Sequence, residues 1–434
     1  MSENKTIIPQ NLGETDKIKI LTLSDHPLLP SGVGTQTRYI CEALLKTGKF
    51  RIMSLGGAIQ HPNYQPSKLP EYGEDWVICP TDGYGTEDLV RTALVSFKPD
   101  ILYFMTDPRF YEWLWKFEDE IRAATPMVYY HVWDNGPLPI FNKPYYDSND
   151  FVASISKVTS EIVKGVSDVE EKYIPHAVDS EVFRPAKTAE EKIKIQRIKE
   201  QNNLEKKFIC FWNNRNARRK QSGSLLFWWK AFLDEVGHDK ATLVMHTEVN
   251  DHHGQPLEVL ADFLGLNTDN KVMFSKQKIP PEDLANFYRL ADCTINISDA
   301  EGFGLATLES LSCETPIVVT MTGGLQEQVT DGENWFGVGI EPTSKSVIGS
   351  LQCPWIYEDR ISEESFVSAL KQIYEKTDKE RKKIGKAGRK HVLENYNFEE
   401  FNKSWVDTML YIHEKFGSWE NRKNHKRRWE MFKI

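Results

Sequence analysis

Short apolar runs alternate with segments of helical spacing along the first part of the chain. The runs expected to form strands are 17–23, 51–55, 76–79, 101–105, 127–131 and 151–155. Between several of them, apolar residues recur every three or four positions, as in 35–46, 86–97 and 111–124. Alternation of strands with helices predicts a parallel sheet covered by helices.

The same pattern restarts after a strongly charged stretch, 188–205, which is expected to be an exposed helix or linker. Strands are expected at 208–212, 242–246, 272–275, 293–297 and 316–320, and helices at 222–233, 257–264, 281–290, 305–312, 366–374, 379–394 and 398–415. We therefore predict an α/β protein with two doubly wound, Rossmann-like domains, 1–187 and 188–395, and a C-terminal helical segment, 396–434. Ligands of such sheets bind at the carboxyl ends of the strands, which predicts a site in a cleft between the domains.

Length and charge agree with this division. The 434 residues exceed what one core usually holds, and 40% apolar with 27% charged residues is the balance of a globular protein. A net charge of −9 argues against a surface that wraps nucleic acid. The basic run 421–429 is a local exception. It is interpreted as a solvated helix end, with contact to an anionic acceptor or membrane surface as the alternative.

The cysteines and the N-terminus indicate which kinds of motif and targeting segment are not expected. None of the six cysteines forms a C-x-x-C pair, so a zinc knuckle or redox motif is not expected. The first 16 residues are polar, and no apolar run approaches the roughly 18 residues of a membrane span. A cytoplasmic location without a transmembrane segment is the simplest expectation.

Two glutamates provide the sharpest chemical signal. Glu301 lies in the loop after the strand 293–297, and Glu309 lies one turn into the next helix, with seven residues between them. Gly302 and Gly304 permit unusual backbone angles and the close approach of a ligand. Carboxylates bind sugar and ribose hydroxyls well, because they accept two strong hydrogen bonds. Taken alone, the pair is also compatible with an ordinary helix start.

Two glycine turns precede helices. Gly32 and Gly34 lie before the helix 35–46, and Gly323 and Gly324 lie before Leu325. Amides at a helix start can bind phosphate or a sugar hydroxyl. A bare glycine turn is an equally good interpretation of each.

Taken together, these features resemble the large retaining glycosyltransferase family marked by an E-x7-E motif. The resemblance spans most of the chain and is strongest over 205–335. It is carried by Ala291-Asp292, Glu301-Gly302-Phe303-Gly304, Glu309 to Pro316, Gly323-Gly324, Asp331-Gly332, the segments 174–179 and 182–185, and Asn395 to Phe398. It implies the GT-B fold, with an acceptor-side first domain, a donor-binding second domain and a closing helix that packs back on the first.

The resemblance also implies roles for individual residues. Glu301 would bind hydroxyls of the transferred sugar, Glu309 the ribose, and the amides of Phe303 and Gly304 the sugar. Arg215 and Lys220, which follow the strand 208–212, match the cations that grip the pyrophosphate, although a basic surface loop would look the same. His131 ends a first-domain strand, where it would face the cleft and touch the donor sugar; a structural histidine is the alternative.

The implied reaction transfers a sugar from a nucleotide-diphosphate sugar with retention of configuration. The acceptor would attack from the face that the phosphate leaves, and that phosphate would take the proton. No cofactor beyond the co-substrate and no metal is expected, because protein cations replace the metal. The adjacent His252 and His253 are better interpreted as part of a polar loop than as metal ligands.

Two positions and one segment depart from the family pattern. Glu314 and Ala177 replace glycines, and 337–360 is longer than the usual connection and has no assignment from sequence. An epimerase of the same fold and a degenerate transferase used for binding are the competing functions. The acceptor stays open among a glycan, a lipid-linked sugar, a small molecule, a protein or a modified nucleic acid.

Overall fold

The computed structural model describes residues 5–10 and 12–425, which divide into two units. The first unit contains the chain up to His176, the short segment Gly349–Pro354 and the chain from Glu399 onward. The second contains Ala177–Ile348 and Trp355–Phe398. The boundary thus precedes the expected 187/188. The reason is that Phe183 packs in the second unit, where its carbonyl accepts a hydrogen bond from Ser312 Oγ at 2.5 Å.

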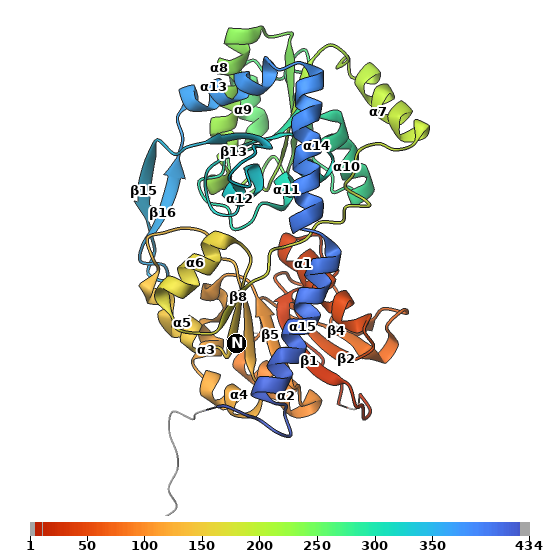
Figure 1. The fold of residues 1–434 in the computed structure, drawn as a ribbon, viewed down its shortest axis with the longest axis vertical. Helices are drawn as coiled ribbons and strands as arrows, with labels where there is room; N and C mark the ends of the chain where they lie inside the picture. Colours follow the sequence, from red (N-terminus) through yellow and green to blue (C-terminus); the bar gives the residue numbers. More distant parts are fainter. Residues whose placement is uncertain (1–4, 11, 426–434) are drawn as a thin grey trace, which may run out of the picture. The chain divides into compact units, whose positions relative to one another are not determined.

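An eight-stranded sheet forms the centre of the first unit (Figure 1). Its strands are β1 (Ile18–Asp25), β2 (Phe50–Gly57), β3 (Ser67–Lys68), β4 (Trp76–Pro80), β5 (Ile101–Met105), β6 (Met127–His131), β7 (Phe151–Ser154) and β8 (Glu171–Tyr173). Their order is β3-β4-β2-β1-β5-β6-β7-β8, and every pairing is parallel except β3 with β4. The strand order therefore reverses between β1 and β5, which is the switch point of a doubly wound sheet.

The helices of this unit are α1 (Gly32–Leu45), α2 (Glu87–Phe97), α3 (Glu112–Trp115), α4 (Glu118–Ala124), α5 (Lys143–Asp147), α6 (Lys157–Val166) and α15 (Phe398–Phe416), of which α15 enters the unit at Glu399. The single helix expected over 111–124 is broken. Phe117 leaves the helical region, with φ −125° and ψ 26°, and buries its side chain in the core. Along α15, buried Trp405 contacts the rings of Tyr103 and Tyr130 at centroid distances of 5.6 and 4.8 Å.

The second unit holds a six-stranded, fully parallel sheet in the order β11-β10-β9-β12-β13-β14. Its strands are β9 (Phe208–Asn213), β10 (Ala241–His246), β11 (Val272–Ser275), β12 (Cys293–Asn296), β13 (Ile317–Thr320) and β14 (Gly337–Ile340). Its helices are α7 (Ala189–Gln201), α8 (Ser222–Val236), α9 (Leu257–Phe263), α10 (Pro281–Leu290), α11 (Leu305–Ser312), α12 (Leu325–Val329), α13 (Glu363–Tyr374) and α14 (Asp378–Asn395). The switch point lies between β9 and β12.

The segment without a sequence assignment forms a β-hairpin after β14. Strands β15 (Ser344–Ile348) and β16 (Ile356–Arg360) pair antiparallel, and we call them with their connection the hairpin arm. The strands belong to the second unit, whereas the arm tip, Gly349–Pro354, belongs to the first. This segment is therefore a structured element and not an irregular connection.

The described part of the basic C-terminal run, residues 421–425, lies after α15 and is only partly solvated: Lys423 is exposed, whereas the side chain of Arg422 is 8% exposed. Arg422 is buried and pairs with Asp150 at 2.7 Å, while its Nε donates to the carbonyl of Arg122. Residues 426–429 of the run lie outside the described residues. Within residues 5–10 and 12–425, no helix has both the length and the apolar character needed to cross a membrane.

Candidate active site

The switch point of the second sheet carries three of the predicted residues. Arg215 and Lys220 follow the carboxyl end of β9, and Glu301 follows the carboxyl end of β12. Because β9 and β12 are hydrogen-bonded neighbours, the loops after them leave the same edge of the sheet side by side. Charged side chains from distant parts of the sequence are thereby brought to one place.

Lys220 and Glu301 form a direct ion pair at this edge. Lys220 Nζ donates to Glu301 Oε2, and the two side chains are 8% and 12% exposed. Asn296 Nδ2 donates to the same carboxylate at 3.3 Å. Burial would raise the pKa of Glu301, but Lys220 and Arg219 outweigh it and lower that pKa below its ordinary value. The site therefore holds an ionised carboxylate beside a sheltered ammonium group.

Glu309 has a different environment. Its Oε2 accepts a hydrogen bond from Tyr288 Oη at 2.6 Å, and the same hydroxyl accepts from Asn213 Nδ2 at 2.9 Å. Burial raises the pKa of Glu309 to about 7, against the opposing effect of the Tyr288 hydrogen bond. Sequence reasoning missed Tyr288, because a tyrosine on the apolar face of α10 gives no signal beyond core packing.

The two glycine segments of the second unit pack against each other. The amide of Gly324 donates to the carbonyl of Glu301 at 3.0 Å. A β-carbon on Gly324 would lie 2.6 Å from Phe303 Cα, so only glycine fits there. Gly304 has φ +93° as it caps α11, and the carbonyl of Phe303 accepts from Gln328 Nε2 at 2.7 Å. Gly302, Phe303, Gly304, Gly323 and Gly324 thus form one loop cluster beside Glu301.

Arg215 forms an ion pair with Asp251. Its Nε and Nη2 contact the carboxylate of Asp251 at 2.6 and 3.2 Å, and its side chain is 63% exposed. The hydrogen bond from Arg215 lowers the pKa of Asp251. The guanidinium is therefore held in place by a carboxylate while it stays open to solvent.

Arg218 and Arg219, which lie between Arg215 and Lys220 in the same loop, both have partners. Arg218 pairs with Glu358 of the hairpin arm, and Arg219 donates to the carbonyl of Ala300. Arg360 joins this network through Glu358 at 2.6 Å and through Asp299 at 2.9 Å. The root of the arm is therefore bound to the loops that carry Lys220 and Glu301.

The glycine turn of the first unit is rigidly held at the switch point after β1. Ser31 Oγ donates to Asp25 Oδ2 at 2.6 Å and accepts from the amide of Gly34 at 2.9 Å. A β-carbon on Gly34 would lie 2.8 Å from the carbonyl oxygen of His26. Gly32 is the first residue of α1. The amide of Gly34 is already used by the helix cap, which differs from the expected phosphate contact.

His131 ends β6 as expected, but its ring is buried instead of open to a cleft. Nε2 and Tyr146 Oη lie 2.7 Å apart, and burial lowers the pKa of His131 to about 3. The imidazole is therefore neutral at physiological pH. The ring is buried because the neighbouring rings of Tyr129 and Tyr146 pack against it.

No group of three or more histidine, cysteine, aspartate or glutamate side chains in the described ranges is arranged to hold a metal ion. All six cysteines are buried and free of disulfides.

Part of this chain is similar in sequence to known proteins. Residues 193–391 match the family model "Glycosyl transferases group 1". A D-inositol 3-phosphate glycosyltransferase of Acidothermus cellulolyticus is 45% identical over 100 residues, which is 23% of this chain and 22% of the relative. A second, from Streptosporangium roseum, is 47% identical over 62 residues, or 14% of each chain. The chain thus spans less than a quarter of the length of these curated relatives.

The structural likeness extends much further. Sucrose-phosphate synthase from Thermosynechococcus elongatus superposes with a TM-score of 0.70 at 17% identity, over 92% of this chain and 100% of that one. The Anabaena protein HepE, solved with UDP and glucose, gives a TM-score of 0.63 at 14% identity, over 91% and 99%. These likenesses establish the fold. The chain therefore has the GT-B fold, and its residues 193–391 are similar to the glycosyl transferases group 1 family.

Proposed function

We propose that this protein is a retaining glycosyltransferase that moves a sugar from a nucleotide-diphosphate sugar to an acceptor. The observation that carries the proposal is the buried Lys220–Glu301 pair at the switch point of the second sheet. It combines a fixed cation for a leaving phosphate with a carboxylate for sugar hydroxyls. A cation positioned before reaction stabilises charge that develops as the diphosphate departs.

The donor side has a partner for each portion of a nucleotide sugar. Glu301 and the amides around Phe303 bind the sugar, Lys220 and Arg215 bind the diphosphate, and Glu309 binds the ribose. Structural neighbours solved with UDP and glucose, or with UDP-glucose, support this class of donor. The outward-facing Arg215 exchanges Asp251 for phosphate oxygens, which its planar fork bridges well.

The reaction breaks the bond between the anomeric carbon and the phosphate oxygen and forms a bond from that carbon to the acceptor oxygen on the same face. The acceptor's proton passes to the departing phosphate, so that nucleoside diphosphate and glycoside are the products. Lys220 and Arg215 stabilise the negative charge on the diphosphate during this step. Glu301 fixes the sugar ring through its hydroxyls, and Glu309 fixes the nucleoside.

The first test is the thermal stability of the purified chain with UDP, GDP, ADP, TDP and their sugar conjugates. A ligand that binds only the folded state adds roughly 2.7 kcal/mol at one hundred times its dissociation constant. We expect a shift with one base, lost in Arg215→Ala. Arg38→Ala is the matched control, because Arg38 is also an exposed arginine paired with one carboxylate, Glu42 at 2.6 Å.

The second test follows the sugar itself. With the donor identified, NMR of the product shows whether the anomeric configuration is kept. Release of nucleoside diphosphate only when an acceptor is added supports transfer. An epimerised nucleotide sugar without an acceptor, or stability unchanged by every nucleotide, would refute the proposal.

A further inference from the structure

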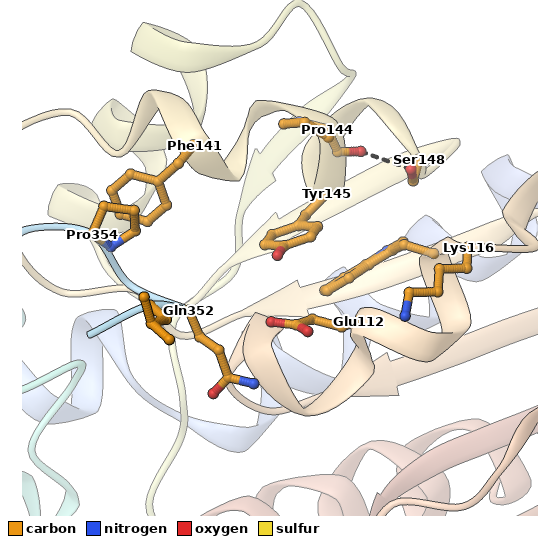
Figure 2. Close-up of a pocket in the computed structure, with 10 residues that line it drawn as sticks. Glu112, Lys116, Phe141, Pro144, Tyr145, Ser148, Gln352 and Pro354 are labelled. Atoms are coloured by element: carbon orange, nitrogen blue, oxygen red, sulfur yellow. Dashed lines mark hydrogen bonds between the residues drawn. The ribbon is translucent and has the colours of Figure 1, made fainter. Parts of the chain in front are cut away.

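The first unit contains a pocket that the donor site does not use. Its volume is about 510 Å³, within the range of small-molecule sites, roughly 300–1,000 Å³. It is lined by α3, by α5 with the residues next to it, and by the arm tip (Figure 2). The side chains are Glu112, Trp115, Lys116, Phe141, Pro144, Tyr145, Ser148, Leu351, Gln352 and Pro354.

One wall of the pocket is aromatic. The rings of Trp115 and Tyr145 stack at a centroid distance of 4.4 Å with their planes 21° apart, so each supports the other. Phe141 and Pro354 lie together on the side of Tyr145 away from Lys116 (Figure 2). Aromatic faces carry negative potential and attract polarised C–H groups, which the apolar face of a sugar ring presents.

Polar groups lie beside the aromatic wall. Figure 2 shows the hydroxyl of Tyr145 pointing toward the carboxylate of Glu112, with the amide of Gln352 on the same side of the ring. Burial raises the pKa of Tyr145, and the charge of Glu112 adds to that rise, so the phenol keeps its proton. A carboxylate, an amide and a phenol together offer both donors and acceptors, as a polyol requires.

The charge of the pocket argues for a neutral ligand. Lys116 is the single cation among the lining residues, and the negative charge of Glu112 balances it. Binding of a phosphate group uses clustered cations or a fork of arginine, and the lining holds no arginine. A stacked aromatic wall with a few convergent polar groups fits an uncharged sugar ring better.

The arm that supplies Gln352 is fixed at its root. Glu358 pairs with Arg218, and the amide of Asp359 donates to the carbonyl of Asp299 at 2.9 Å. Arg360 contacts Asp299 at 2.9 Å. These contacts bind β16, at the base of the arm, to the loops after β9 and β12 of the second unit.

We propose that this pocket binds a neutral sugar unit of the acceptor, with the arm tip selecting it through Gln352. The inference rests on the proposed function, and it names the acceptor class that function leaves open. Glu112 and Gln352 are the specificity residues, and Trp115 with Tyr145 forms the platform.

The test is binding of the full-length chain to an array of neutral and phosphorylated glycans, followed by titration of the best neutral glycan. We expect Gln352→Ala and Glu112→Gln each to weaken that binding roughly tenfold, because each removes a hydrogen bond to a sugar hydroxyl. Gln65→Ala and Glu161→Gln are matched controls in the same unit, since both residues are exposed and neither lines the pocket. Tyr145→Ala tests the platform by removing the less buried of its two stacked rings.

A separate titration with the nucleotide sugar measures donor binding, and it distinguishes failure of the pocket assignment from failure of the proposed function. A wild-type chain that binds donor but no neutral glycan, or pocket variants that bind neutral glycans normally, would overturn the pocket assignment alone. Preference for phosphorylated glycans that is lost in Lys116→Ala would overturn the neutral class. Failure of the wild type to bind any nucleotide sugar would instead count against the proposed function, and the glycan titrations would still decide the pocket.

Discussion

The ammonium group of Lys220 donates a hydrogen bond to the carboxylate of Glu301, although 81 positions separate the two residues in the chain. Both side chains are nearly buried. The contact exists because β9 and β12 are neighbours in the sheet and each residue lies in the loop after its strand.

Removing either partner is expected to reduce turnover and stability together. We predict that Lys220→Met and Glu301→Gln each lower kcat by a factor on the order of 10², because each removes transition-state stabilisation. Each also lowers the free energy of unfolding by about 3 kcal/mol, because it leaves a buried group unpaired. Steady-state kinetics and urea denaturation measure the two effects.

Lys230→Met is the control for this pair. Lys230 contacts Asp234 at 2.6 Å, but both side chains are more than a third exposed, so its loss should cost under about 1 kcal/mol and leave kcat unchanged. Near-normal turnover in both folded site variants would contradict the assignment.

Donor affinity should depend on the ionisation of Glu309. Glu309 is proposed to bind the ribose, and its pKa of about 7 means that this carboxylate is protonated as pH falls through 7. We expect the Kd for a nucleotide sugar to rise between pH 8 and pH 6 by isothermal titration. The Glu309→Gln variant should bind more weakly at pH 8 and lose this dependence.

Tyr288 tunes that titration. Its hydrogen bond lowers the pKa of Glu309, so Tyr288→Phe should move the midpoint upward. The stability of the fold depends on pH in the opposite direction to donor affinity. Folded Glu309 keeps a proton that the unfolded chain releases above its ordinary pKa of 4.5. Glu309 therefore lowers the free energy of unfolding as pH rises from 4.5 to about 7. A midpoint that stays in place in Tyr288→Phe would rule out this coupling.

His131 should stay neutral through the working range. Its folded pKa of about 3 lies below the ordinary 6.5, so the unfolded chain binds a proton first and stability falls as pH drops from 6.5 toward 3. Proton–nitrogen NMR of labelled histidine should show an uncharged ring at pH 6. A charged imidazole there would mean that the ring is open to water, as the sequence alone had led us to expect.

The glycines of the donor loop should differ from other glycines of the same backbone conformation. Gly304 and Gly332 have φ +93° and +98°, but a β-carbon on Gly304 would lie 2.6 Å from Leu325 Cδ2, whereas Gly332 has nothing within 4 Å. Gly332→Ala should cost only the left-handed conformation, about 1–2 kcal/mol. Gly304→Ala should cost more and weaken donor binding. Equal losses of stability by denaturation would show that the loop tolerates the contact.

Hydrophobic periodicity located most elements of both sheets correctly, since strands and helices of two and 3.6 residues per repeat leave a local signal. The expected ranges 101–105, 127–131, 272–275, 281–290 and 305–312 agree with β5, β6, β11, α10 and α11 to the residue. The break at Phe117 was missed, because it depends on where that ring packs. The hairpin arm was missed because β15 is largely exposed and the buried positions of β16 are the acidic Glu358 and Asp359, so neither strand shows apolar alternation.

The sequence by itself determined the fold class, the order of strands and helices, and which residue types stand after β9 and β12. Tertiary structure decided which of them meet: Lys220 with Glu301, Glu309 with Tyr288, and Gly324 with Phe303. It also decided that His131 is enclosed. The physical reason is that periodicity is encoded by neighbours in the chain, whereas burial, ion pairing and pKa depend on contacts between segments that only the packed sheet brings together.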